Sequence, residues 1–214
     1  MRFTRKVILC SLFLTGSVVV GQDIKPPTPY LDRGACPFEC CTYRRWTVEA
    51  GTVLYNQRST NSGVAFRVQK GVQVTGLTGI VITRKPGKVL VKKARTIGLE
   101  RKIRVGPGDI LYTLHYQGEG NYKLWFRGKI YEEEMPTSPY LVTNVPIEQR
   151  EEYLQVIAEP DSIWWVQVKN ARGQTGWTKQ HRHFGNMDAC GGQSPKTDFS
   201  LVVSKTSSTP KEKS

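Results

Sequence analysis

Beyond residue 21 the sequence lacks any apolar run that approaches the roughly 20 residues of a membrane-spanning helix. We therefore expect the processed chain to be soluble and to have no transmembrane span. Histidine is scarce, with three residues in 214, and cysteine occurs only five times. These shortages leave few side chains for acid–base, nucleophilic or metal-assisted catalysis.

None of the histidines falls in a pattern that indicates catalysis. His115 is expected on a strand face near the surface. On a strand, His181 and His183 would share a face and could chelate a metal, but no third ligand is evident, so we expect both to be solvated. The adjacent glutamates 132–134 have no carboxylate partner at a fixed distance and are expected to form a solvated strand end. We therefore expect no enzyme activity, no cofactor and no metal site.

The first 21 residues have the pattern of a secretory signal peptide. Arg2, Arg5 and Lys6 form a basic head, residues 7–14 are apolar, and residues 16–21 are small and apolar. Cleavage is expected near residue 21. The alternative, a buried N-terminal strand, would have to explain the basic head. We therefore expect a secreted or periplasmic protein.

The chain is strongly basic. It has 31 Lys and Arg residues against 18 Asp and Glu residues, a net charge of +13, and loss of residues 1–21 leaves about +10. Such a charge suits anionic partners such as cell-wall polymers, lipid surfaces or acidic glycans. An exported protein rarely meets nucleic acid, so we expect no nucleic-acid partner. The alternative is a basic surface whose only effect is solubility.

Four cysteines remain after processing: Cys36, Cys40, Cys41 and Cys190. Their even number and the expected compartment favour two disulfides. A bond between the adjacent Cys40 and Cys41 would need a strained ring, so Cys190 should pair with Cys40 or Cys41, and Cys36 with the other. A four-thiolate zinc site is the competing interpretation, although zinc sites usually present paired C-x-x-C motifs.

Alternating apolar residues and frequent turn signals predict an all-β fold. Residues 22–34 are Pro-rich and should be extended, and residues 193–214 should be disordered. Trp164, Val166 and Val168 should lie on one strand face, followed by a turn at residues 170–173.

Further turns are predicted elsewhere in the folded part. Residues 79–93 should form a hairpin about residues 85–88, and residues 118–121 should turn another pair of strands. Gly128 should allow a bend or bulge, and residues 159–162 another turn. Residues 145–152 should form a short helix or turn at most.

Two segments carry a family resemblance. Residues 164–178 end in W-x-x-V, a turn and G-x-x-G-W-T, and residues 52–77 read as strand, polar loop, strand and Lys-Gly turn. Both segments resemble bacterial SH3-like domains. The resemblance implies small β-barrels that act as binding or targeting modules. Because an alternating strand buries one face, Trp164 or Trp165 and Trp177 should lie in or beside the core. It allows one barrel with a long hairpin insertion, or two SH3-like lobes, which we favour, at residues 35–138 and 139–192.

Charge is unevenly distributed along the chain. Residues 84–104 carry nine basic side chains and one acidic, whereas residues 132–161 carry eight acidic and one basic. The two stretches could complement each other across the fold, the basic stretch could bind an anionic polymer, or it could be a solvated loop. The candidate polymer-binding residues are Lys88, Lys92, Lys93, Arg95, Arg101, Lys102 and Arg104. We expect a non-enzymatic module that binds cell-envelope polymer such as peptidoglycan, or alternatively an envelope protein or peptide.

Overall fold

The computed structural model describes residues 23–135 and 152–190, and these residues form an all-β fold without an α-helix. Within this described part there is no helix that could span a membrane. The expected signal peptide, the expected disordered tail and most of residues 145–152 lie outside the described residues. The strands and one 3-10 turn are β1 (Tyr30–Arg33), β2 (Arg45–Val48), β3 (Thr52–Tyr55), β4 (Val64–Val68), β5 (Gln73–Lys85), β6 (Lys88–Val91), β7 (Arg95–Ile97), β8 (Ile103–Val105), β9 (Ile110–Gly118), β10 (Asn121–Phe126), β11 (Lys129–Glu134), β12 (Leu154–Ala158), β13 (Asp161–Lys169), β14 (Thr175–Thr178), η1 (His181–His183) and β15 (Phe184–Gly185).

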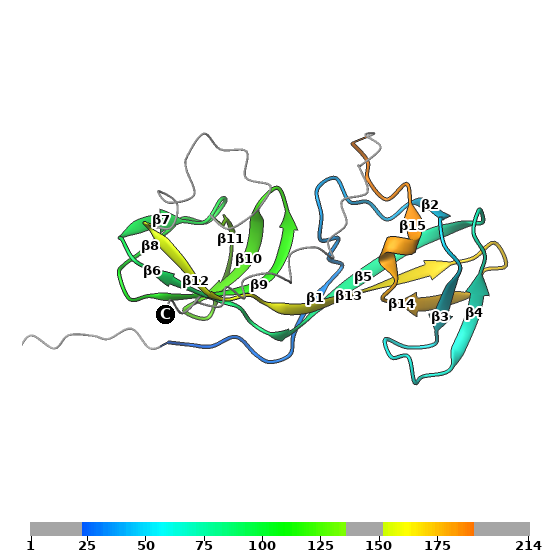
Figure 1. Cartoon of the computed structure of the whole chain (residues 1–214), viewed down its shortest axis with the longest axis horizontal. Helices are drawn as coiled ribbons and strands as arrows, with labels where there is room; N and C mark the ends of the chain where they lie inside the picture. The colour runs from blue at the N-terminus through cyan, green and yellow to red at the C-terminus, as the bar shows by residue number, and fades with distance from the viewer. Residues whose placement is uncertain (1–22, 136–151, 191–214) are drawn as a thin grey trace, which may run out of the picture.

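The strands form two lobes that lie side by side (Figure 1). In chain order, the strands of one lobe are inserted between β5 and β13 of the other. The disulfide lobe comprises β1–β5 and β13–β15, with the sheet order β15-β2-β5-β13-β14-β3-β4 and β1 beside β5. The inserted lobe comprises β6–β12 and contains a five-stranded sheet, β11-β10-β9-β6-β12, and the β7–β8 hairpin. The lobes therefore follow sheet membership and not chain order, because the chain leaves the first sheet at β5 and returns at β13.

The core of the disulfide lobe lies on the strand face that the sequence predicts. Trp164, Val166 and Val168 alternate along β13 and are buried with Trp46 and Leu54. The β13–β14 hairpin about residues 170–173 is confirmed, with Val166 opposite Thr178. A separate core fills the inserted lobe: Val89, Val91, Ile97, Val105, Leu111, Leu124, Phe126, Tyr131, Met135 and Leu154.

The turns of the inserted lobe are partly as predicted. Residues 118–121 connect β9 to β10, which pair antiparallel. Gly128 lies in the β10–β11 turn with φ +77°, a conformation that glycine adopts without strain. The predicted hairpin over residues 79–93 is wrong, because β6 pairs with β9 and β12 and not with β5. Gly87 instead donates its N–H to Thr113 O on β9 at 2.8 Å, so this turn carries the chain between sheets.

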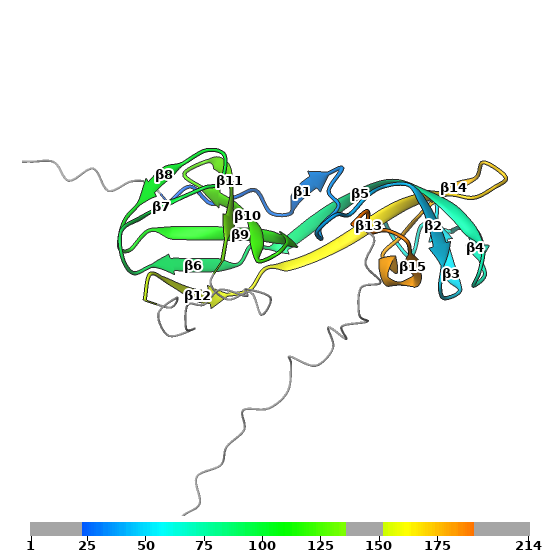
Figure 2. The same ribbon diagram turned by 90° about the horizontal axis from the view of Figure 1, so that it is seen from above.

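Two segments of the described chain run between the lobes. The first is the long ribbon of β5 and β13, paired from Lys85 and Asp161 to Thr75 and Lys169 (Figure 2). The second is an N-terminal strap, residues 23–33. At one end Asp23 accepts a hydrogen bond from Tyr112 Oη of the inserted lobe at 2.7 Å. At the other end the strap becomes β1 and pairs with β5 of the disulfide lobe.

Candidate functional site

The basic and acidic stretches meet in the fold. Arg84 contacts Asp161 at 2.6 Å, Arg95 contacts Glu133 at 2.7 Å, and Lys93 pairs with Glu152. The predicted complementarity between residues 84–104 and 132–161 is therefore confirmed for three pairs. Two of the pairs are solvent-exposed and contribute little stability.

The expectation that residues 132–134 form a solvated strand end is wrong for Glu133. Its side chain is buried, and its carboxylate accepts hydrogen bonds from Arg95 and from the Gly98 N–H at 2.7 Å each. Burial raises the pKa of Glu133, against the lowering effects of the Gly98 N–H and Arg95. Alternation along β11 explains the burial, because residues 131 and 133 face inward.

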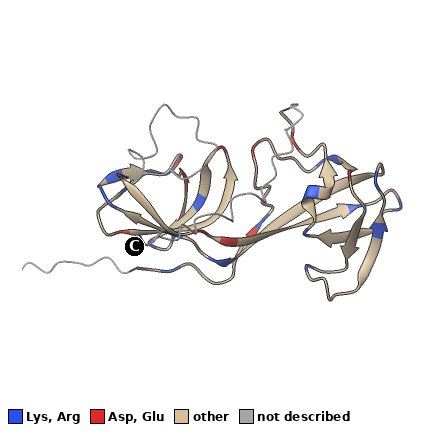
Figure 3. Cartoon of the chain, viewed as in Figure 1, with Lys and Arg blue, Asp and Glu red and all other residues tan. Residues whose placement is uncertain are grey.

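Of the seven candidate polymer-binding residues, Lys93 and Arg95 form ion pairs with Glu152 and Glu133 of the same chain. The other five are exposed, and none has a carboxylate partner within the described ranges 23–135 and 152–190. They follow the chain from β6 to β8, and Figure 3 shows Lys and Arg on the β7–β8 side of the inserted lobe. We call them the cationic surface: Lys88, Lys92, Arg101, Lys102 and Arg104.

A second candidate site lies in the disulfide lobe. An open groove of about 510 Å³ is lined by Arg33 at the end of β1, by the β3–β4 loop with Arg58, by Thr78 and Ile80 of β5, and by Trp177 of β14. The Arg58 guanidinium lies 5.4 Å from the centroid of the Trp177 ring. Trp177 is half-buried, whereas Trp164 and Trp165 are buried. Neither Arg33 nor Arg58 falls in a sequence pattern that indicates binding.

The end of the strap positions Arg33. Arg33 pairs with Ile80 on β5, and Gly34 donates its N–H to Gly79 O at 2.8 Å. The carbonyl of Ala35, the residue after Gly34, accepts hydrogen bonds from Trp164 Nε1 at 3.2 Å and from Tyr43 Oη. Trp164 therefore fixes the chain beside the groove as well as filling the core.

Hydrogen bonds within the β3–β4 loop position Arg58. Asn56 donates its N–H to Gly63 O at 3.1 Å, and Gln57 donates its N–H to Ser62 Oγ at 3.0 Å. Ser62 Oγ in turn donates to Ser59 O at 2.7 Å. A loop closed in this way loses little conformational freedom on ligand binding.

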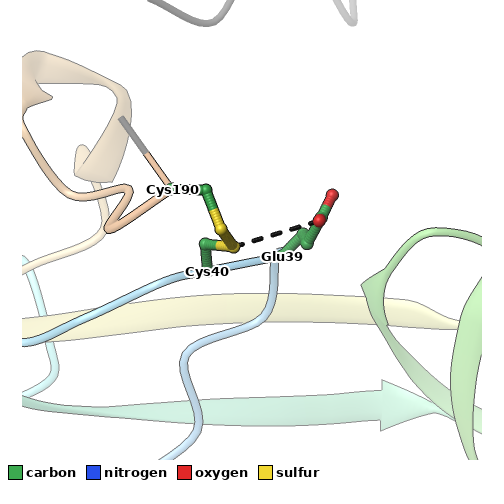
Figure 4. Close-up of side chains that lie close together, drawn as sticks. All are labelled: Glu39, Cys40 and Cys190. Atoms are coloured by element: carbon green, nitrogen blue, oxygen red, sulfur yellow. Dashed lines mark hydrogen bonds between the residues drawn. A yellow bond between two sulfur atoms is a disulfide. The ribbon is translucent and has the colours of Figure 1, made fainter. Parts of the chain in front are cut away.

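Two disulfides follow Arg33 in the chain. Cys36 bonds to Cys41, and Cys40 bonds to Cys190, which selects one of the two pairings left open by the sequence. Glu39, Cys40 and Cys190 form the only cluster of potential metal ligands in the part of the chain that the structure describes (Figure 4). It does not make a metal site, because both sulfurs are in the disulfide; for the same reason the 3.9 Å contact between Cys40 Sγ and Glu39 is not a hydrogen bond.

His115 is buried at the junction of the lobes, so the expectation of a position near the surface is wrong. Its Nε2 lies 2.7 Å from the carboxylate of Asp32 on β1, and its Nδ1 lies 2.9 Å from Tyr116 O. Lys123 Nζ donates to the same Asp32 oxygen at 2.6 Å. Burial alone would raise the pKa of Asp32, but the hydrogen bonds and charges of His115 and Lys123 lower it.

The other histidines lie on the 3-10 turn η1 and not on a strand. The His181 ring packs 4.8 Å from the Trp164 ring, and burial, aided by the charge of Arg182, lowers the pKa of His181 to about 4. His183 Nδ1 lies 2.9 Å from Thr52 Oγ1. The expectation that these histidines are solvated is wrong for His181, which packs on Trp164, whereas His183 is only half-buried.

Comparisons with known proteins identify no relative: no family model, no curated protein and no solved structure matches the chain.

Proposed function

We propose that this protein is a non-enzymatic binding module that acts outside the cytoplasm, where it holds an anionic cell-envelope polymer such as peptidoglycan. In this proposal the two lobes are SH3-like and residues 1–21 are a cleaved signal peptide. Two disulfides support an oxidising compartment.

The observation that carries the proposal is the cationic surface. Acidic residues that are close in the fold pair with Arg84, Lys93 and Arg95. The five residues of the cationic surface stay exposed without such partners in the described chain. Positive charges that a protein leaves unpaired attract a polyanion, and attraction spread over several residues gives affinity without a closed pocket.

Co-sedimentation of the purified protein with purified cell-wall sacculi tests this function. Binding should weaken steeply as the salt concentration rises, because exposed charges are screened. Replacing Lys92, Arg101 and Lys102 with Gln should weaken binding about tenfold, if each exposed contact contributes about 0.5 kcal/mol. A matched control removes three exposed charges from the disulfide lobe: Arg67, Lys70 and Lys169. Equal losses in the two triple variants would contradict a role for the cationic surface.

A peptide-binding function is the alternative, and the edge strand β12 favours it. Among the described strands, β12 pairs only with β6, and its Ile157 is 54% exposed. An extended peptide could add to this edge through main-chain hydrogen bonds. Such binding should depend little on salt, so the salt series that tests polymer binding also separates the two functions.

A further inference from the structure

The outer sheet face beside the groove crosses several strands and includes Trp177 and Thr78 of the groove lining. Trp177 lies opposite Tyr55 on one side and opposite Gln167 on the other, and Gln167 lies opposite Thr78. Directly opposed residues on neighbouring strands point to the same face of a sheet. All four side chains are partly exposed, whereas Val166 and Val168 face the core. The outer face therefore presents a continuous row of two aromatic rings, an amide and a hydroxyl.

The rim of the groove is cationic. Arg33 and Arg58 line it from two segments of the chain, and the residues that line the groove in the described structure include no carboxylate. Neither guanidinium has an ion-pair partner among residues 23–135 and 152–190. A planar guanidinium with free donors matches a carboxylate, which it can bind through two hydrogen bonds.

The remaining polar groups of the groove are neutral. Asn56, Gln57 and Ser59 carry amide and hydroxyl groups that can both donate and accept hydrogen bonds. Sugar hydroxyls also donate and accept, so these groups match the hydroxyls of a sugar ring that lies beside Trp177. The groove is open and not enclosed, so it suits a segment of a longer chain.

We propose that this groove binds an acidic oligosaccharide, with its sugar rings along the groove beside Trp177 and a carboxylate held by Arg33 and by Arg58, whose guanidinium lies over the Trp177 ring. The proposal rests on the proposed function and deepens it, because it names the chemical class of the polymer and a second site for it. The groove and the cationic surface lie on different lobes. Their contributions are therefore separable by mutation.

Isothermal titration calorimetry with α-1,4-linked tetragalacturonate as the probe tests the groove in the full protein. The methyl-esterified tetramer is the matched ligand, because it keeps the sugar rings and removes the charge. We expect tetragalacturonate to bind and the ester to bind at least about tenfold more weakly, as for the loss of a charge-assisted pair. Equal binding of the two tetramers would overturn the carboxylate assignment.

Three variants locate the binding. Arg58→Gln and Arg33→Gln should each weaken binding about five- to tenfold, and Trp177→Leu should weaken it by a similar factor. Arg172→Gln, which removes an exposed charge from the β13–β14 turn of the same lobe, should change the affinity less than about twofold. If Arg58→Gln and Arg33→Gln behave like Arg172→Gln, the groove is not the site. Circular dichroism of each variant establishes that the sheet is retained, and Arg58 is in a surface loop where substitution leaves the core intact.

The sacculus and tetramer experiments fail independently. If sacculi bind through the cationic surface but the groove variants leave the affinity for tetragalacturonate unchanged, the proposed function stands and the groove inference is wrong. If tetragalacturonate binding depends on Arg58 and sacculi are not bound, the groove inference stands and peptidoglycan is not the polymer.

Discussion

The two disulfides should contribute unequally to stability, and their loop lengths set the difference. The Cys40–Cys190 bond closes a loop with a sequence separation of 150, whereas the Cys36–Cys41 separation is 5. In the chain-entropy model the long loop stabilises the folded state by about 5 kcal/mol and the short loop by about 2 kcal/mol. Replacing both cysteines of the long-range bond with Ser should therefore reduce the free energy of unfolding by about 3 kcal/mol more than replacing Cys36 and Cys41.

The folded segment around Cys190 has contacts that survive loss of the bond. Ala189 donates its N–H to Cys40 O at 2.7 Å, and Arg44 donates to Asn186 Oδ1 at 2.8 Å. The double variant should therefore fold to the same structure, and its loss should come mainly from a less constrained unfolded chain.

Urea unfolding followed by tryptophan fluorescence measures the effect. The midpoint of the long-range variant should fall further than that of the short-range variant, and double substitution avoids reshuffling of a leftover thiol. A loss in the Cys36/Cys41 variant that equals or exceeds the loss in the Cys40/Cys190 variant would refute the loop-length argument. Contacts of the local loop would then dominate.

Three further perturbations should change stability. Gly79→Ala should destabilise the protein by about 1–3 kcal/mol and lower its thermal midpoint, because the added Cβ would lie 2.3 Å from Trp164 Nε1 and from Tyr43 Oη. The control Gly106→Ala meets open space and should leave the thermal midpoint nearly unchanged. The pKa of His181 is lowered to about 4 in the folded protein, whereas it is about 6.5 in the unfolded chain. The stability that the neutral His181 contributes is therefore complete above pH 6.5. It is lost as the pH falls towards 4, by up to about 3 kcal/mol. Urea unfolding between pH 4 and 7 measures this slope, and a His181→Gln variant with the same slope would contradict the assignment. Asp32→Asn should destabilise the protein by about 2–3 kcal/mol, because it leaves the largely buried Lys123 without its anion, whereas Asp161→Asn in an exposed pair should cost less than about 1 kcal/mol. Similar losses for the two variants in urea unfolding would contradict a stabilising role of Asp32 at the junction.

The local sequence pattern predicted individual strands and turns better than it predicted which strands pair with each other. Alternation at Trp164, Val166 and Val168 identified the buried face of β13, because a strand places every second side chain on one side. The turn at residues 170–173 was predictable for a similar reason, since a short polar turn between alternating segments usually joins antiparallel neighbours. Both features depend only on residues that are close in the sequence.

Partners distant in the sequence were not predictable in this way. Residues 85–88 carry a turn signal, yet the turn moves the chain to a different sheet, where β6 pairs with β9. The burial of His115 depends on Asp32, which is 83 positions away. The groove likewise assembles Arg33, Arg58 and Trp177 from three separate segments, and no spacing rule connects them.

The insertion gives the junction between the lobes a mechanical role. Any relative movement of the lobes must bend the β5–β13 ribbon and also disturb the strap, which is fixed by Asp23 on one lobe and by β1 on the other. The shared hydrogen bonds of Asp32 with His115 and Lys123 add a third constraint at the same place. These contacts restrict relative movement of the lobes that carry the groove and the cationic surface. If both proposed sites bind one polymer, a chain long enough to span them would meet the second site at high effective concentration once the first is occupied, whereas a short oligomer would gain no such advantage.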